Sequence, residues 1–315
     1  MSAPGTPRTQ AGPAWPSGVE RCLRPPPGVE QMPPFDAGWI TNGDAPQAFL
    51  SYVSAGHAGT GAASLERLHE ELSRTHCLDV WTRRAMLDRL GALGREATAL
   101  DIGCASGYLL HDLHRSAPHV TLIGLDLLDS GLRKAHAAIP EALLLQADAC
   151  ALPLVDQSVD AVVSANLLEH VLDDERALAE IRRVLRPGGR AVIVVPLGPG
   201  NYDYYDRFVG HERRYARGEL ARKARRAGLD VLEDICLGAP LYPAFWLVKQ
   251  RNRRRHEHLR GEALERRAVR DVERTEDSSA GRLACRLEEW LLRRGARLPF
   301  GIRGLTVLAR PGGSS

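Results

Sequence analysis

Three aspartates end short apolar runs, where a carboxylate can act on a ligand. They are Asp101 in "ALDIGCASG", Asp126 in "LIGLD" and Asp148 in "QADACALPL". A carboxylate at Asp101 would repel the pyrophosphate of a dinucleotide and attract an ammonium group. Asp126 is placed to accept both hydroxyls of a ribose, and Asp148 to accept from the exocyclic amine of a purine. The three acids together describe an adenosine that has a cationic tail and no phosphate.

The loop after Asp101 has small residues at every second position: Gly103, Ala105 and Gly107. Small residues let the backbone approach a ligand closely. Their spacing differs from the GxGxxG fingerprint of dinucleotide-binding proteins. Taken by itself, this loop can also be a glycine-rich turn that binds nothing. In combination with the three acids it predicts S-adenosylmethionine (SAM) as the ligand.

Glu169 and His170 follow the fourth apolar run, in "NLLEHVLDD". The simplest interpretation is that they begin a helix and pack or form hydrogen bonds there. His170 can alternatively serve as a base or contact the substrate, because imidazole titrates near neutral pH. The pair can also act as metal ligands, but we expect no metal here.

A short segment, residues 199–215, reads "PGNYDYYDRFVGHERRY" and is rich in hydrogen-bond donors. Loops that follow strand ends form substrate sites in open α/β sheets. We therefore name His211 and Tyr205, with His170, as candidate catalytic residues. If this segment contacts the substrate, Arg213 and Arg214 favour an anionic one. The alternative is that these arginines pair with nearby acids and cap the following helix.

The hydrophobic pattern from residue 97 onward predicts the strands and helices that position these candidate residues. Continuous apolar runs alternate with amphipathic helical stretches, which is typical of a parallel sheet covered on both faces. The predicted strands cover residues 97–103, 120–126, 142–148, 159–166 and 190–196, a sixth at the end of 218–237, and a final one at 304–311. Helical patterns also occupy residues 64–74 and 77–93.

Composition limits the remaining classes of function. The chain has 315 residues, 44% of them apolar, and 42 basic against 39 acidic side chains, which argues against a dedicated nucleic-acid binder. Its six cysteines are scattered without zinc spacing, and the N-terminus lacks a signal-peptide pattern, so we expect a cytoplasmic protein with reduced thiols. The oligomeric state is left open.

The predicted organisation has five segments. They are a disordered or loosely docked proline-rich arm (1–34), an N-terminal helical substrate or cap segment (35–96), a SAM-binding core (97–238), a helical lid insertion (239–303), and a final core strand with a tail (304–315). The insertion contains "LYPAFWLVKQRNRRR", an apolar run before a basic cluster, which can contact an anionic membrane surface. We favour the lid, because a site that excludes water needs a cover.

The motifs above, together with "NLLEHVLDDERALAEIRRVLRPGGRAVIVVP" and "GHERRYARGEL", resemble the class I SAM-dependent methyltransferases, in particular bacterial small-molecule enzymes with a GHxRRY-like segment. The resemblance covers about residues 97–238 and the last strand. It implies an α/β, Rossmann-like three-layer sandwich with a seven-stranded, mostly parallel sheet, whose last strand is inserted antiparallel, plus N-terminal helices and a helical insertion. It implies cofactor binding by Asp101, Gly103, Cys104, Gly107, Asp126, Leu127, Asp148, Ala149 and Asn166. Some relatives bind a divalent metal through Glu-x-x-Glu-His, but here Asn166 stands at the first Glu position.

The resulting prediction is an enzyme that transfers a methyl group from SAM to a small or medium metabolite. The expected acceptor is a hydroxyl oxygen of a glycan, a lipid-linked molecule or a natural product. Methylation of nitrogen or carbon is the alternative, and so is a non-catalytic SAM-binding partner protein. A nucleic-acid methyltransferase ranks low, because the fourth strand ends in "SANLLEH" rather than in a target-base motif such as NPPY.

Overall fold

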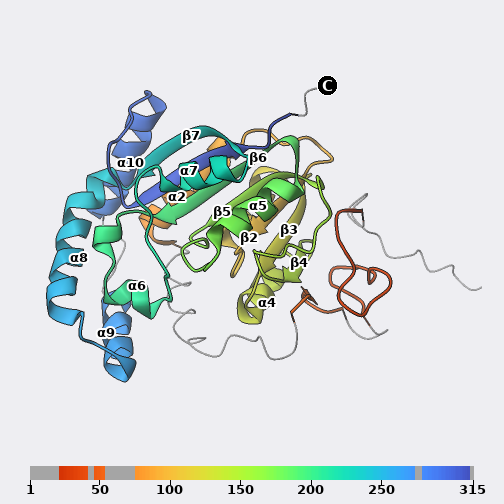
Figure 1. Ribbon diagram of the computed structural model, residues 1–315, viewed down its shortest axis with the longest axis horizontal. Helices are drawn as coiled ribbons and strands as arrows, with labels where there is room; N and C mark the ends of the chain where they lie inside the picture. Colours follow the sequence, from red (N-terminus) through yellow and green to blue (C-terminus); the bar gives the residue numbers. More distant parts are fainter. Residues whose placement is uncertain (1–20, 42–45, 54–74, 274–278, 313–315) are drawn as a thin grey trace, which may run out of the picture.

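A computed structural model describes residues 21–41, 46–53, 75–273 and 279–312, and it has a single mixed sheet at its centre (Figure 1). The strand order is β1-β4-β3-β2-β5-β6-β8-β7. The strands are β1 (Leu50–Ser51), β2 (Thr98–Ile102), β3 (Thr121–Asp126), β4 (Leu143–Gln146), β5 (Val159–Ala165), β6 (Leu185–Pro196), β7 (Asp230–Leu237) and β8 (Arg303–Ala309).

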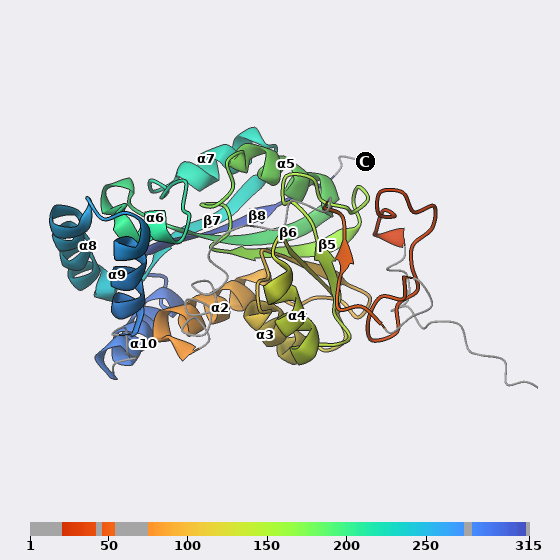
Figure 2. The same cartoon turned by 90° about the horizontal axis from the view of Figure 1, so that it is seen from below.

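Helices cover both faces of this sheet and make three layers. α2, α3 and α4 lie on one face, and α5 and α7 on the other (Figure 2). Two buried clusters fill the spaces between the layers, and side chains of β2 alternate between them: Leu100 and Ile102 in one, Ala99 in the other. The helices are α2 (Cys77–Leu90), α3 (Tyr108–Ser116), α4 (Asp129–Ala138), α5 (Asp174–Val184), α6 (Tyr204–Phe208), α7 (Glu219–Arg226), α8 (Tyr242–His256), α9 (Gly261–Glu273) and α10 (Ser279–Arg293), with short 3₁₀ turns η2 (Pro199–Asn201) and η3 (Ala239–Leu241).

The direction of β8 shows from which edge of the sheet the segments after β6 and β7 leave. β1 to β6 pair in parallel, whereas β8 is antiparallel to both β6 and β7. β6 and β7 therefore run the same way, and the segments that follow them leave from the carboxyl edge of the sheet. This confirms the predicted Rossmann-like α/β class, with its last strand inserted antiparallel.

The sheet has eight strands rather than the predicted seven. The extra strand, β1, has two residues and pairs in parallel with β4 at the edge. Leu50 and Ser51 contain too short a pattern to be distinguished from a loop.

The proline-rich arm was predicted to be disordered or loosely docked, and its described part is docked against the sheet. Cys22 and Leu23 are buried, and Leu23 forms a bridge with Leu154. Slightly further on, Trp39 is fully buried and its indole nitrogen donates to the carbonyl of Leu144 at 3.0 Å. Prolines prevent regular structure here, but these apolar side chains gain enough from burial beside β4 to fix the segment. Residues 1–20, and the helix predicted over 64–74, lie outside the described residues.

The insertion before the last strand is helical, as α8, α9 and α10. Glu288 of α10 is fully buried and anchors it. Its carboxylate accepts from the backbone N–H groups of Gly238 and Ala239, both at 2.8 Å, and from the indole of Trp81 at 2.9 Å. The end of the insertion is therefore tied to its beginning and to α2. No described helix has both the length and the apolar character needed to cross a bilayer.

Candidate active site

Asp101 lies at the carboxyl end of β2 and is the most unusual acid of this edge. Its side chain is 1% exposed, and its Oδ2 has no hydrogen-bond partner among the described residues. Burial, assisted by the charge of Asp126, raises the pKa of Asp101 to about 8. A buried carboxyl without a partner is costly, and a bound cation would relieve that cost. The position therefore fits the ammonium group of the predicted ligand.

The loop after Asp101 has three residues in the left-handed backbone conformation. Gly103 and Gly107 have φ of +76° and +77°. A Cβ on Gly103 would lie 2.9 Å from the side chain of Leu167, so the loop packs closely against the segment that follows β5. Ala105 also has a positive φ, +45°, which an alanine adopts at some cost. The three small residues thus serve the backbone geometry of the loop. The amides of Gly103, Ala105 and Gly107 are already bonded within the chain, to Leu125, Asp126 and Cys104.

Asp126 fixes this loop from the neighbouring strand. Its two carboxylate oxygens accept from the backbone N–H groups of Ala105 and Leu128, each at 2.9 Å. Each oxygen keeps further acceptor capacity. Asp126 thus holds the loop and can also accept from ligand hydroxyls.

The other predicted cofactor residues lie along the same edge. Asp148 is exposed just after β4 and accepts from the backbone N–H of Cys150 at 2.8 Å, while Ala149 is buried. Leu127 is exposed beyond β3, and Cys104 is buried beneath the loop. Asn166 follows β5 with φ +53°. The residues come from four adjacent strand ends, which is where open parallel sheets bind ligands.

His211 and Asp206 form a hydrogen-bonded pair at the same edge, in the segment after β6. The Nδ1 of His211 lies 2.8 Å from Asp206 Oδ1, and its Nε2 lies 3.8 Å from Glu169 Oε1. Burial opposes ionisation of Asp206, but the His211 hydrogen bond and the charges of Lys249 and Arg214 outweigh it and hold the pKa of Asp206 well below its usual range. An anionic Asp206 stabilises the tautomer of His211 that carries its proton on Nδ1, which leaves Nε2 as an acceptor.

Lys249 of α8 extends this pair into a buried charge network. Its ammonium donates to Asp203 Oδ1 at 2.7 Å and to Asp206 Oδ2 at 3.0 Å. Asn252, one turn further along α8, donates to Asp203 Oδ2 at 3.2 Å. The insertion is thus attached directly to the segment that holds His211. Sequence reasoning missed both aspartates and Lys249; the available signal was the two acids in "YDYYDRFVGH", five and eight residues before His211.

Both arginines of the GHxRRY segment are paired inside the chain. Arg214 is buried and donates to Asp206 at 2.7 Å, and Arg213 lies 3.2 Å from Asp174. Pairing with acids, one part of the alternative interpretation, is therefore observed, and these two arginines no longer argue for an anionic substrate. The helix α7 that follows has Gly218 as its N-cap and no side-chain cap. Their charges are already neutralised by acids that the sequence separates from them.

Glu169, His170 and His211 form a compact set beside the loop. One ligand atom of each lies within 4.8 Å of the others, and the two imidazole rings contact edge to face at 4.7 Å. Glu169 is fully buried, neither of its oxygens has a hydrogen-bond partner among the described residues, and burial raises its pKa to about 8. Two imidazoles and a carboxylate are donors that a divalent transition ion accepts.

Tyr205, the third predicted catalytic residue, is half-buried on α6. Burial raises the pKa of its phenol, so it remains protonated and can donate. The ammonium of Lys249 lies 5.7 Å from the centre of its ring. Tyr205 therefore belongs to the same cluster as His211, on the side of the insertion.

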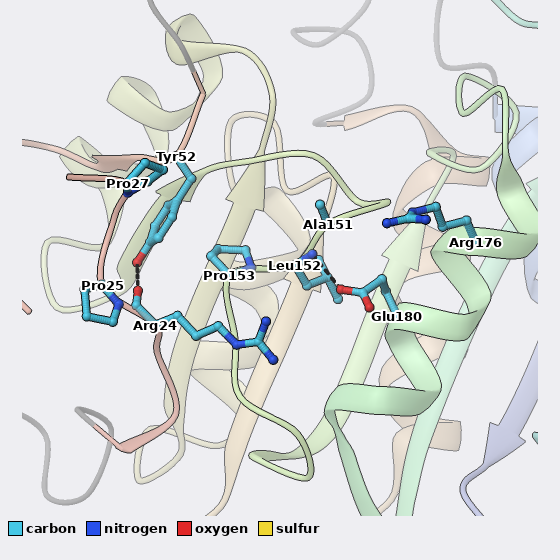
Figure 3. Close-up of a pocket in the computed structure, with 9 residues that line it drawn as sticks. All are labelled: Arg24, Pro25, Pro27, Tyr52, Ala151, Leu152, Pro153, Arg176 and Glu180. Atoms are coloured by element: carbon cyan, nitrogen blue, oxygen red, sulfur yellow. Dashed lines mark hydrogen bonds between the residues drawn. The ribbon is translucent and has the colours of Figure 1, made fainter. Parts of the chain in front are cut away.

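The two described pockets lie away from this cluster. One, of about 410 Å³, is formed between the N-terminal segment and α5, with Arg24, Tyr52, Arg176 and Glu180 in its wall (Figure 3). Tyr52 there donates to the carbonyl of Arg24 at 2.6 Å. The other, of about 610 Å³, lies at the amino edge of the sheet around residues 90–97 and 186–190. Neither contains a predicted site residue, and ligands of such sheets bind at the carboxyl edge.

Comparison with known proteins identifies the domain. Residues 100–193 match the family model described as "Methyltransferase domain". The chain is 30% identical over 185 residues to a protein of Mycolicibacterium smegmatis named "Probable S-adenosylmethionine-dependent methyltransferase", covering 56% of this chain and 66% of that protein. It is 38% identical over 118 residues to a demethylmenaquinone methyltransferase of Thermus thermophilus, covering 36% and 53%.

Among solved structures, geranyl diphosphate methyltransferase in complex with GPP and sinefungin shares the fold. The TM-score is 0.51 at 20% identity, with 82% of this chain and 86% of that chain covered. The chain spans between half and two thirds of the length of the two curated relatives. Fold, motif and comparisons agree that residues 100–193 lie in a class I SAM-dependent methyltransferase domain, which confirms the predicted class; the GHxRRY-like subtype stays a prediction. The predicted cofactor, SAM, is confirmed with it.

Proposed function

We propose that this chain transfers a methyl group from SAM to a hydroxyl oxygen of a small or medium metabolite, of a glycan, lipid-linked or natural-product type. The observation that carries the proposal is the Asp206–His211 pair, which orients the imidazole so that Nε2, 3.8 Å from Glu169 Oε1, can accept a proton at the carboxyl edge. A hydroxyl acceptor must lose its proton during methyl transfer, and an oriented imidazole is suited to remove it.

The cofactor would be held by the acids of the strand ends. Asp101 pairs with the ammonium group, Asp126 accepts from the ribose hydroxyls, and Asp148 accepts from the adenine amine, with Ala149 beside the ring. Oδ2 of Asp101 supports this assignment, because this buried oxygen has no hydrogen-bond partner among the described residues. When bound, SAM supplies an electrophilic methyl group. Gly103, Gly107 and Asn166 allow the backbone to approach its methionine part.

The acceptor would lie between this loop and the segment after β6. His211 takes the proton of the acceptor hydroxyl, while Asp206 keeps its ring oriented and stabilises the imidazolium that forms. His170 and Tyr205 line the acceptor position. A general base of this kind contributes roughly 10²–10⁴-fold, and positioning supplies the larger part of the rate.

The insertion would act as a lid in this scheme. Lys249 and Asn252 attach α8 to the two aspartates beside His211, so closure of the insertion and orientation of the base are connected. A covered site excludes water, which would otherwise compete for the methyl group.

Titration calorimetry of the purified chain with SAM, S-adenosylhomocysteine and NAD is the experiment that tests the proposal. We expect the first two to bind and NAD not to bind. A screen of acceptor alcohols, amines and activated carbons with methyl-labelled SAM then identifies the acceptor atom. Binding of SAM without methylation of any acceptor class would favour a non-catalytic partner protein.

A further inference from the structure

Exposed apolar side chains gather on two helices of the insertion. Eleven large hydrophobic side chains are exposed in the described chain, and six of them belong to α8 or α10: Trp246, Leu247, Val248, Leu283, Leu287 and Trp290. A seventh, Phe300, lies beside α8, with its ring 5.3 Å from that of Tyr242. Single exposed apolar residues are ordinary, but such a concentration marks an interaction surface. We call these seven residues the α8–α10 surface.

The orientation of this surface is fixed by buried polar anchors. On α10, Leu283, Leu287 and Trp290 are spaced four and three residues apart and share one face. The opposite face carries Glu288, which is held by two backbone N–H groups and the indole of Trp81. On α8, Lys249 is held in the same way by Asp203 and Asp206. The apolar side chains therefore cannot turn inward without breaking buried charge-assisted hydrogen bonds.

Positive charge is concentrated on the same two helices and just after α10. Residues 242–256 and 279–297 contain nine exposed arginines: Arg251, Arg253, Arg254, Arg255, Arg282, Arg286, Arg293, Arg294 and Arg297. The acids of these two ranges are Glu288, which is fully buried, and Glu289, which is half-buried and paired with Arg293 at 2.7 Å. The whole chain has a net charge of only +3, so these helices hold a local excess of positive charge, which acidic residues elsewhere in the chain balance.

We propose that the α8–α10 surface binds an anionic lipid membrane, with its tryptophans and leucines in the interfacial region and its arginines on the headgroups. Helices that expose Trp and Leu among Arg side chains bind membranes in this way. A second copy of this chain is a poorer occupant, because an isologous contact would bring arginine against arginine. The surface thus has the chemistry of a lipid interface rather than of a self-contact.

The proposal deepens the proposed function and rests on it in one respect: it selects the lipid-linked class of acceptor. The α8–α10 surface belongs to the insertion that follows the carboxyl end of β7, and α8 also contributes Lys249 to the network around His211. A membrane bound there would lie on the side of the molecule where the acceptor site is. A lipid-linked hydroxyl could then reach His211 without leaving the bilayer surface completely.

Vesicle co-sedimentation of the full chain tests the surface without any need for turnover. The probes are vesicles of pure phosphatidylcholine and vesicles with about one third phosphatidylglycerol. We expect binding to the anionic vesicles with a blue shift of tryptophan emission, and a strong loss of binding when salt is raised to about 0.5 M. Absence of binding to anionic vesicles overturns the proposal, and so does equal binding to both compositions.

Two variants, each with a different mode of action, check the assignment. The L287S/W290S double variant removes apolar contact and should weaken vesicle binding at least tenfold; R254Q/R255Q should do so through charge alone. The matched control is L232S on β7, where a leucine 53% exposed lies outside the surface. SAM titration and thermal unfolding verify that each variant folds. If the variants bind vesicles like the parent, or if light scattering shows a dimer that L287S/W290S dissociates, the membrane assignment is wrong. SAM affinity, measured on the same proteins, tests the proposed function independently of vesicle binding.

Discussion

Replacing Asp101 by Asn tests how the buried carboxyl recognises the cofactor. With a pKa of about 8, Asp101 is roughly nine-tenths protonated at pH 7 in the unliganded chain. Binding an ammonium group requires the ionised form, so each pH unit below 8 should weaken SAM about tenfold, or about 1.4 kcal/mol. One proton should be released for each SAM bound near neutral pH.

Asp101 makes the stability of the unliganded chain fall as pH rises, whereas an ordinary paired carboxylate makes stability rise with pH. The folded chain retains the Asp101 proton from about pH 4 to pH 8, whereas the unfolded chain loses it at about pH 4. The folded state therefore binds more protons in this window, and the stability of the unliganded chain should fall as pH rises through it. Glu169, with its pKa also raised to about 8, adds to this fall.

The assay is calorimetric titration with SAM between about pH 6 and pH 8.5, in buffers of different ionisation enthalpy. In the Asp101→Asn variant, SAM should bind roughly 10- to 100-fold more weakly at pH 8, with a flat pH dependence, because a charge-assisted hydrogen bond is lost. 5′-Methylthioadenosine, which lacks the ammonium group, is the matched control ligand and should show no slope in either protein. A slope that persists in Asp101→Asn would refute the assignment.

Four further outcomes are expected. Asp126→Ala should weaken SAM by roughly 1.5–3 kcal/mol in titration calorimetry, and unchanged affinity would exclude its ribose contact. His211→Ala should lower turnover roughly 10²–10⁴-fold while SAM affinity is retained; equal loss of both would make His211 a cofactor contact. Lys249→Met should lower the free energy of unfolding by about 3–5 kcal/mol, because Asp203 and Asp206 remain buried and lose the ammonium that they share; denaturant unfolding measures it, and a loss below about 1 kcal/mol contradicts it. EDTA should leave SAM affinity unchanged, because the residues assigned to the cofactor are separate from the three that could ligate a metal; a decrease would indicate a bound ion.

The central strands could be predicted from sequence because burial on both faces makes their pattern continuous. Prediction was less accurate where a strand contains residues that ordinarily break one. β6 was predicted to begin at Arg190, yet it begins at Leu185 and continues through Pro187 and two glycines. The register between β5 and β6 shifts there, between Val159 and Ala161, which accommodates the irregular stretch. Sequence patterns do not show where a sheet tolerates a bulge.

Some residues of the candidate site could be predicted from their position in the chain, whereas contacts between residues far apart in the sequence could not. Asp101 and Asp126 could be named because a carboxylate at a strand end has a recognisable position in the chain. The Asp206–Lys249 contact could not, because it joins residues 43 apart across β7 and part of the insertion. Pairing of Arg214 with Asp206, rather than with a substrate, likewise depends on the fold of the segment and not on its composition.

The place of β8 has a consequence for how the chain is made. This strand, residues 303–309, is the last to be synthesised, yet it separates β6 from β7 in the finished sheet. Until it emerges, the hydrogen-bonding edges of both strands are unpaired, and such edges are sites of aggregation. A nascent chain that stops before Arg303 would retain nearly all of its apolar core and lack the strand that joins β7 to the sheet. We expect the yield of folded protein to depend strongly on residues 303–309, although none of them is assigned to the cofactor or the acceptor.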